Sequence, residues 1–158
     1  MSNLSIEEAK TRQAAEICAV LRRSIKEICG PDYGNDETVL AEWLANKTPD
    51  NVSAWIQDPS CFSLVALIND NIVGFAHASK NEVLLNYALP EHLGEGVGYS
   101  MLAAIEKWAA KQGVAELKCV STITALTFYK RQGFKASGEP EYVGEILGDF
   151  PLSKQLVI

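Results

Sequence analysis

Hydrophobic and polar positions change their spacing near residue 60. Before it, apolar residues recur every three or four positions, the period of a helix buried along one face. The apolar stripes of two expected helices are formed by Ile17, Val20, Leu21, Ile25, Ile28, and then Val39, Leu40, Trp43 and Leu44. Thr11 is expected to cap the first helix and Gly30-Pro31 to end it. Asn35 or Asp36 is expected to cap the second helix, and Thr48-Pro49 opens a third, short one. A short strand over residues 4–9 precedes these helices.

After residue 60 the pattern becomes that of strands, with short apolar runs bounded by turn formers. Residues 61–68 and 72–79 are expected to form a hairpin, and a strand over 83–89 follows. The later expected elements are a helix with apolar Met101, Leu102, Ile105, Trp108 and Ala109, a strand over 116–120, a helix over 123–132, and strands over 141–147 and 150–158 joined around Gly148-Asp149. This order predicts one α/β domain over residues 1–158 with a mixed central sheet.

Three glycines, Gly94, Gly96 and Gly98, lie between the expected strand over 83–89 and the helix after it. Free N–H groups and the positive dipole end of a helix N-terminus favour an anion there, most simply a phosphate. A P-loop would need a lysine directly after Gly98, where Tyr99 stands. A dinucleotide fingerprint would need its third glycine at that same position, so neither pattern fits.

The loop resembles that of the Gcn5-related N-acetyltransferase (GNAT) family, whose pattern is Gln/Arg-x-x-Gly-x-Gly/Ala. The window over residues 93–98 reads LGEGVG and keeps Gly96 and Gly98, with Leu93 in place of the usual Gln or Arg and with a carboxylate at Glu95. A second family signature follows as Thr122-x-x-Ala125-x-x-Phe128-Tyr129-x-x-x-Gly133-Phe134. The resemblance is closest over residues 81–134.

The resemblance implies a mostly antiparallel sheet flanked by helices on both faces, and acetyl-CoA as the cofactor. In this fold the strands equivalent to 83–89 and 116–120 splay apart to admit the pantetheine arm. The residues that it assigns to acetyl-CoA are Tyr87, Ala88, Leu93, Gly94, Glu95, Gly96, Val97, Gly98, Tyr99, Thr122, Ala125 and Phe128. The main-chain N–H of Tyr87 or Ala88 would polarise the thioester carbonyl, and Lys130 and Arg131 could meet the phosphates.

Acetyl transfer to an amine needs a neutral nucleophile and a proton donor for the leaving thiolate. Tyr129 matches the family position that protonates the CoA sulfur; the alternative is that Phe128 and Tyr129 are aromatic residues of the helix core. The resemblance makes Glu82 a general-base candidate, because it lies sixteen residues before Gly98, the spacing of the catalytic glutamate in histone-type members of the family. Glu82 also lies four residues before Asn86, which predicts one shared strand face. An edge carboxylate, with a water chain as the base, is the alternative for Glu82.

Acceptor recognition in this fold comes from the first helices and the last hairpin. The resemblance therefore points to Asp32, Tyr33, Trp43 and Tyr142. Asp32 could bind an ammonium group and the aromatic rings could surround it by cation–π contacts. The alternative for Trp43, on an apolar stripe, is a place in the core.

The charge and composition of the chain limit the classes of partner that can be expected. The net charge is −6, which disfavours nucleic acid and favours amines. No signal pattern and no apolar run of about 18 residues is present, so a cytoplasmic protein with no membrane span is expected. Cys18, Cys29, Cys61 and Cys119 lie far apart and are expected to be reduced thiols, and no metal site is expected.

The leading hypothesis is an N-acetyltransferase that moves the acetyl group of acetyl-CoA to a primary amine of a small molecule or protein, by direct attack in a ternary complex. A non-catalytic acetyl-CoA sensor is the alternative, favoured by Leu93 and Glu95 and disfavoured by Tyr129. A nucleotide- or phosphosugar-binding protein is a third reading. The sequence leaves open whether the chain forms a homodimer.

Overall fold

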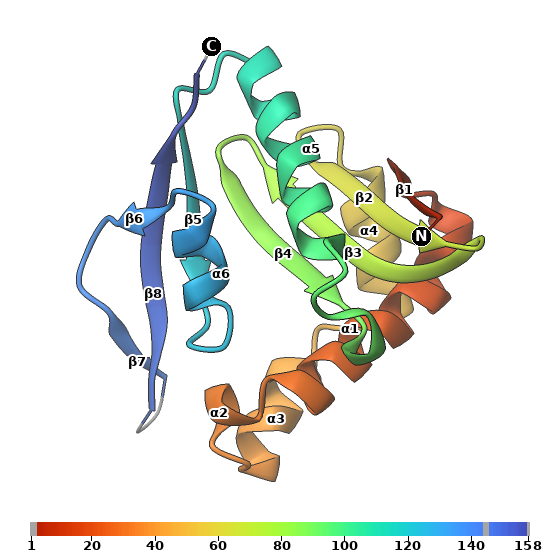
Figure 1. Cartoon of the computed structure of the whole chain (residues 1–158). Helices are drawn as coiled ribbons and strands as arrows, with labels where there is room; N and C mark the ends of the chain where they lie inside the picture. Colours follow the sequence, from red (N-terminus) through yellow and green to blue (C-terminus); the bar gives the residue numbers. More distant parts are fainter. Residues whose placement is uncertain (1–2, 144–145, 158) are drawn as a thin grey trace.

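The computed structural model describes residues 3–143 and 146–157 (Figure 1). Its helices are the 3₁₀ turn η1 (Thr11–Gln13), α1 (Ala14–Ile28), α2 (Gly30–Tyr33), α3 (Glu37–Leu44), α4 (Pro49–Gln57), the 3₁₀ turn η2 (Pro90–His92), α5 (Val97–Lys111) and α6 (Leu126–Arg131). Its strands are β1 (Leu4–Glu8), β2 (Phe62–Ile68), β3 (Asn71–Ser79), β4 (Glu82–Ala88), β5 (Glu116–Ser121), β6 (Lys135–Ala136), β7 (Glu141–Val143) and β8 (Ile146–Gln155).

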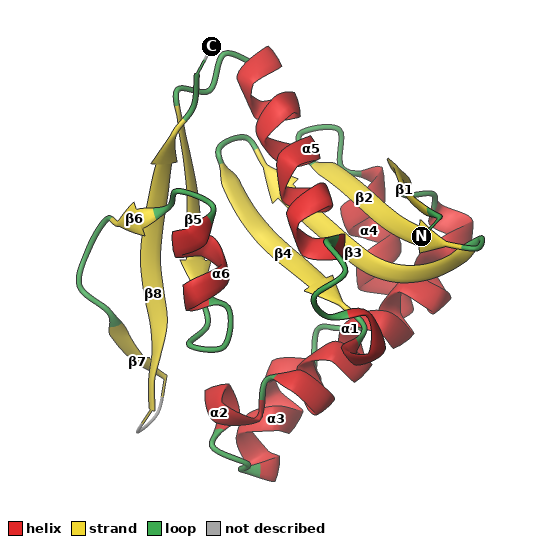
Figure 2. Cartoon of the chain, viewed as in Figure 1, coloured by secondary structure: helices red, strands yellow, loops and turns green. Residues whose placement is uncertain are grey.

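The strands form one mixed sheet in the order β1-β2-β3-β4-β5-β8-β6, with β7 paired to β8. Only the β4–β5 pair is parallel among the pairs described, and helix α5 makes the crossover between these two strands. Helices α1 and α4 cover one face of the sheet and α5 and α6 the other (Figure 2). The predicted α/β class with a mixed, mostly antiparallel sheet flanked on both faces is confirmed.

Two large clusters of buried side chains hold these layers together. One lies beneath α5 and α6 and contains Met101, Ile105 and Phe134, and the other lies beneath α1 and α4 and contains Ile17, Leu21 and Phe75. Burying such side chains contributes about 1.5–3 kcal/mol each before entropy is counted. A third, smaller cluster packs α2 and α3 against the end of α1.

Gly74 in β3 lets the start of α5 approach the sheet closely. A Cβ at this position would stand 2.9 Å from Cγ1 of Val97 and 3.1 Å from the main-chain oxygen of Tyr87. Any larger residue would push the first turn of α5 away from β4. The packing of the sheet therefore sets where the N-terminus of α5 lies.

Several expected boundaries differ from the structure. Thr11 begins the turn η1, and Gln13 is the residue that precedes α1. The expected turn at Gly148-Asp149 is wrong, because β8 runs through both residues; β7 ends at Val143, and residues 144–145 lie outside the described part of the chain. Strand β6 was not predicted, since two residues give no periodic pattern.

Three further properties of the described residues are the state of the cysteines, the grouping of possible metal ligands and the length of the helices. Cys18, Cys29 and Cys119 are buried and Cys61 is half-buried, and all four are free thiols. Within residues 3–143 and 146–157, no three His, Cys, Asp or Glu side chains gather where they could hold a metal ion. Over the same ranges, no helix combines the length and the apolar content that crossing a membrane requires.

Candidate active site

Strands β4 and β5 pair at one end only. Glu82 pairs with Lys118 and Val83 with Cys119, and the parallel pairing stops there, whereas β4 stays paired to β3 as far as Ala88 (Figure 1). Past Val83, the edge of β4 that faces β5 therefore has no strand partner. Unpaired strand edges bind extended, amide-containing ligands through main-chain hydrogen bonds. We call the space between the diverging strands the wedge.

A cleft of about 470 Å³ lies at the open end of the wedge. Of the twelve residues expected to bind acetyl-CoA, eleven line it: Tyr87, Ala88, Leu93, Gly94, Gly96, Val97, Gly98, Tyr99, Thr122, Ala125 and Phe128. The cleft is also lined by residues that the resemblance did not assign to acetyl-CoA: Ile28, Cys29, Asn86, His92, Thr124, Thr127 and Gln132. Arg131 of α6, a candidate for the phosphates, lines it as well. The two sequence motifs thus meet on one cavity.

The glycine loop presents main-chain donors to this cleft. Gly94 and Gly96 have φ angles of +80° and +83°, which side chains with a Cβ adopt only with strain. The first helical hydrogen bond of α5 runs from Ser100 N to the Gly96 carbonyl (2.9 Å), so the N–H groups of Val97, Gly98 and Tyr99 have no partner within the helix. Together with the helix dipole, they form a site for an anion.

The two departures from the family pattern leave these donors accessible. The carboxylate of Glu95 lies 2.9 Å from Nδ1 of His92, and Glu95 is not among the residues that line the cleft. Leu93 is 56% exposed at the rim and carries no charge that would oppose an anion. The features that favoured a non-catalytic module therefore do not block the anion site.

Tyr129 is buried in the wall of the wedge. Its ring makes edge-on contacts with Phe128 (centroids 5.2 Å apart) and Phe134 (5.4 Å). Burial raises the pKa of its hydroxyl above the ordinary value of 10, and the nearby Cys119 raises it further, while the side chain of Asn86 opposes the change. Tyr129 is thus held as a neutral hydrogen-bond donor over the physiological range of pH.

Asn86 is the polar side chain at the centre of the site. Its Nδ2 donates to the Gly98 carbonyl (3.4 Å), and its Oδ1 is buried with no hydrogen-bond partner among the residues that the structure describes. A buried acceptor left unpaired costs about 1–3 kcal/mol, so a ligand that brings an N–H group would be favoured here. The amides of a pantetheine arm have such groups, and the site therefore fits acetyl-CoA. In the sequence, Asn86 stands out only as a polar residue within the apolar run of β4.

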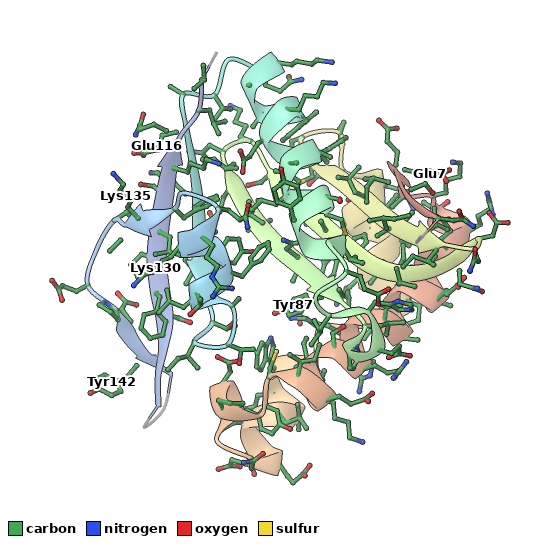
Figure 3. The ribbon with its side chains drawn as sticks, viewed as in Figure 1. Glu7, Tyr87, Glu116, Lys130, Lys135 and Tyr142 are labelled. Carbon is green, nitrogen blue, oxygen red and sulfur yellow. The ribbon has the colours of Figure 1, made fainter. Side chains whose placement is uncertain are left out.

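Two further titratable groups line the cleft near the end of helix α1: Cys29, which follows the helix, and Tyr87 of β4. Burial raises the pKa of the Cys29 thiol to about 12, and the charge of Asp32 adds to the effect. Burial likewise raises the pKa of Tyr87, whose side chain lies beside α1 (Figure 3). Cys29 is therefore a thiol and a poor nucleophile.

A β-bulge separates Glu82 from Asn86. The register of β3 with β4 shifts by one residue, which leaves Leu84 as an extra residue on β4. Val83 is part of the core beneath α5, and neighbouring strand residues point to opposite faces, so Glu82 lies on the face away from α5 while Asn86 bonds to α5. The expectation that the two share a face is wrong, because it assumed a regular strand. Glu82 does not line the cleft.

The four expected acceptor residues have different surroundings. Tyr33 is buried and Trp43 half-buried in the cluster that packs α2 and α3 against α1, as the core alternative predicts. Tyr142 is 70% exposed and projects from β7 (Figure 3). Asp32 is 7% exposed, and both of its carboxylate oxygens accept hydrogen bonds from Thr124.

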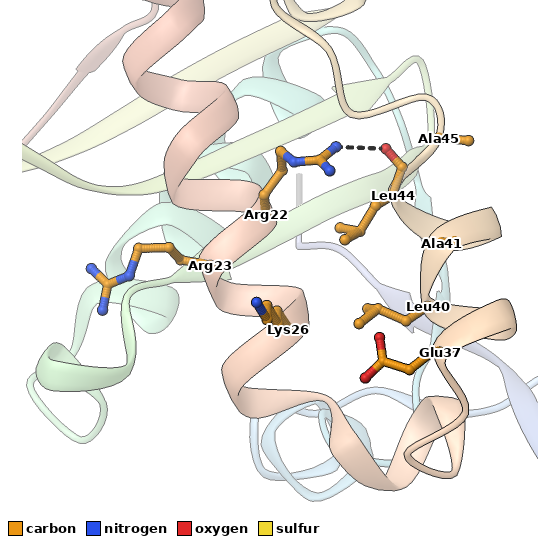
Figure 4. A pocket seen from close by; sticks show the side chains of 8 residues that line it. All are labelled: Arg22, Arg23, Lys26, Glu37, Leu40, Ala41, Leu44 and Ala45. Carbon is orange, nitrogen blue, oxygen red and sulfur yellow. Dashed lines mark hydrogen bonds between the residues drawn. The ribbon is translucent and has the colours of Figure 1, made fainter.

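A separate hollow lies between α1 and α3 (Figure 4). Arg22 spans it and donates to the main-chain carbonyls of Leu44 (2.9 Å) and Lys47 (3.0 Å), at the end of α3 and just beyond it. Arg23 bridges Glu27 and Glu91 and so ties α1 to η2. The two bonds of Arg22 hold the end of α3 against α1.

Comparisons with known proteins identify the family of the chain. A family model described as an acetyltransferase (GNAT) domain matches residues 29–156. The uncharacterized N-acetyltransferase YafP of Escherichia coli (strain K12) is 25% identical over 144 residues, 85% of this chain and 83% of that protein.

Solved structures share the fold. A GCN5-related N-acetyltransferase from Rhodopseudomonas palustris superposes with a TM-score of 0.87 at 25% identity, over 99% of this chain and 98% of that one. The PaiA N-acetyltransferase of Thermoplasma acidophilum in complex with coenzyme A gives a TM-score of 0.81 at 20% identity, over 97% and 99%. The chain belongs to the GNAT family and is an acetyl-CoA-dependent N-acetyltransferase.

Proposed function

We propose that this enzyme acetylates a primary amine of a small molecule or protein, by direct attack of the amine on acetyl-CoA within a ternary complex. The observation that carries the proposal is that the free N–H groups at the start of α5 and the unpaired edge of β4 lie on one cleft, with the buried Tyr129 packed against Phe128, which lines that cleft. Each matches one part of acetyl-CoA. The N–H groups suit the diphosphate, the strand edge suits the pantetheine amides, and Tyr129 suits the sulfur.

The main-chain geometry of β4 favours Ala88 over Tyr87 as the donor to the thioester carbonyl. Leu89 N donates to the Val73 carbonyl across the β3–β4 ladder (2.8 Å). Antiparallel ladders alternate, so the main-chain groups of Tyr87 turn toward β3 and the N–H of Ala88 turns toward the wedge. The N–H of Ala88 is therefore placed to stabilise negative charge that develops on a carbonyl oxygen.

Tyr129 is assigned to the leaving sulfur. A phenol whose pKa is raised by burial gives up its proton less readily than an exposed one, so its stabilising contribution is a hydrogen bond donated to the thiolate as charge develops. Acetyl-CoA supplies the activated acetyl group, and Tyr129 lowers the cost of losing the thiolate.

Direct attack is favoured over an acetyl-cysteine intermediate. Cys29 is the cysteine that lines the cleft, and its raised pKa leaves almost no thiolate at neutral pH. Initial rates measured with both substrates varied are expected to give intersecting double-reciprocal lines, as a ternary complex requires. Parallel lines would contradict direct attack.

Glu82 is proposed as the base that takes up the proton of the attacking amine through solvent, since it lies outside the cleft. In Glu82→Gln the acid limb of the pH profile of kcat/KM is expected to shift. An unchanged profile would remove Glu82 and leave water as the acceptor of the proton.

The acceptor class is tested by an acetyl-transfer screen over polyamines, amino acids, aminoglycosides and peptide N-termini. Release of the CoA thiol and mass spectrometry of the acetylated amine are followed together. We expect at least one primary amine to be turned over, with matched tertiary amines unreactive. Tight CoA binding without transfer to any amine would contradict the proposed reaction.

A further inference from the structure

One contact beside the cleft joins segments 92 residues apart. Asp32 of α2 accepts a hydrogen bond from Thr124 N (3.2 Å) through Oδ1 and another from the Thr124 hydroxyl through Oδ2. Thr124 lies in the turn between β5 and α6 and lines the cleft. The contact thus connects α2 to the turn that leads into α6, the helix of Tyr129.

Both ends of this contact are held firmly. On the α2 side, the Tyr33 hydroxyl donates to the Lys26 carbonyl (2.9 Å) and its ring is buried. On the other side, Ala125 N donates to the Thr122 hydroxyl (3.1 Å), and Tyr129 N donates to the Ala125 carbonyl (3.1 Å). A displacement of Thr124 would therefore also move the first turn of α6 and Tyr129.

The carboxylate of Asp32 has no cation beside it among the described residues. The ion pairs of residues 3–143 and 146–157 do not include it, although it is almost fully buried. A buried carboxylate needs hydrogen bonds to offset the loss of water, and Thr124 supplies two donors, its main-chain N–H and its hydroxyl. Because both oxygens accept in this way, Asp32 is committed to its contact with Thr124.

We propose that Asp32 is a positioning residue that acts through Thr124: it holds the 122–125 turn, and with it Tyr129, at the distance from β4 that acetyl transfer requires. This inference rests on the proposed role of Tyr129. It replaces the expectation that Asp32 contacts the ammonium group of the acceptor, because that role would require a carboxylate free to exchange partners.

The two roles respond differently to matched substitutions. Asp32→Asn keeps an acceptor for Thr124 N and removes the charge, whereas Asp32→Ala removes both contacts. Thr124→Val keeps the shape of threonine and removes its hydroxyl, and Thr124→Ser keeps the hydroxyl. For a positioning role we expect Asp32→Ala and Thr124→Val each to lower kcat about 10-fold, with the KM for the amine changed less than about threefold.

Two further variants complete the test. The double variant Asp32→Ala/Thr124→Val is expected to lose no more than Asp32→Ala alone, since that substitution already removes both hydrogen bonds. Asp32→Asn and Thr124→Ser are expected to recover most of the lost kcat. If Asp32→Asn were as damaging as Asp32→Ala and raised the amine KM about 10-fold while Thr124→Val kept its kcat, Asp32 would bind the acceptor and the proposal would fail.

Hydrogen–deuterium exchange tests the contact without any acceptor or turnover. Amides of the 122–130 segment should exchange faster in Thr124→Val than in the unmodified enzyme, and at the original rate in Thr124→Ser. Equal exchange in all three would overturn the proposal even if the enzyme acetylates amines. Faster exchange in an enzyme without acetyl transfer would instead leave the contact in place and contradict the proposed function.

Discussion

The side-chain amide of Asn86 donates to the main-chain carbonyl of Gly98 over 3.4 Å, which joins strand β4 to the first turn of helix α5. The opposite atom of the same side chain, Oδ1, is buried and unpaired beside the wedge. One residue therefore connects the anion site to the strand edge where the thioester would lie. Its position depends on the β4 bulge, which turns Asn86 toward α5.

Replacing Asn86 is expected to weaken cofactor binding. Asn86→Ala removes the bond to Gly98 and the buried acceptor, and we expect the Kd for CoA to rise about 10-fold, in line with about 1–2 kcal/mol for a buried hydrogen bond to an amide. Calorimetric titration with CoA measures the change. An unchanged Kd would mean that Oδ1 of Asn86 meets no donor of the cofactor.

Replacing Tyr129 is expected to slow chemistry and spare binding. Tyr129→Phe keeps the edge contacts with Phe128 and Phe134 and removes the hydroxyl, so kcat should fall by about 10²–10⁴ while the Kd for CoA stays within about threefold. Single-turnover measurements with a reactive amine would show the loss in the chemical step. Turnover at the original rate would remove Tyr129 from the reaction.

Stability is expected to fall in mild acid because of His77. Its Nδ1 lies 2.8 Å from the Ser63 hydroxyl and its ring stacks near Trp55, and burial lowers its pKa below 6.5 although the nearby Asp58 opposes this. The unfolded chain therefore binds a proton at a pH where the folded chain does not. The contribution of His77 is complete above about pH 6.5 and is lost as the pH falls from there toward the folded pKa.

Urea unfolding at pH 7.5, 6.5 and 5.5 measures this effect. The free energy of unfolding should decrease by at most about 1.4 kcal/mol per pH unit below pH 6.5, and His77→Gln should flatten the dependence. An equally steep dependence in His77→Gln would assign it to other groups. Asp58, whose pKa is lowered chiefly by its hydrogen bonds to Ser60, acts only at more acidic pH.

The sequence was sufficient to predict the architecture, and its two motifs lie on one cleft as expected. The helical period of residues 14–57 and the strand pattern of residues 61–88 are both plain in the sequence, and the capping residues Asp36 and Thr48 accept the bonds expected of them. The free N–H groups of Val97, Gly98 and Tyr99 depend on φ angles and on a helix start, and both leave a glycine signal. The second motif at 122–134 then identified the cofactor.

What the sequence missed depends on register and on distant contacts. A β-bulge at Leu84 places Glu82 on the opposite face of the sheet from Asn86, and no residue type in the sequence marks this bulge. The bond from Asp32 to Thr124 joins positions 92 apart, and a carboxylate before a tyrosine reads equally well as a binding residue. Gly148-Asp149 looks like a turn from its composition, yet β7 pairs with β8 on both sides of Gly148, at Leu147 and Asp149, and β8 stays extended through it.

Two glycines allow a matched test of whether the N-terminus of α5 binds the phosphates of acetyl-CoA. Gly96 and Gly113 have φ angles of +83° and +82°, and a Cβ at either would meet no atom within 4 Å, so an aspartate imposes similar backbone strain at both. Gly96 lines the cleft, whereas Gly113 follows the far end of α5. Calorimetric titration with CoA should show at least about 100-fold weaker binding for Gly96→Asp and an almost unchanged Kd for Gly113→Asp. Equal affinity in the two variants would contradict the assignment of this cleft.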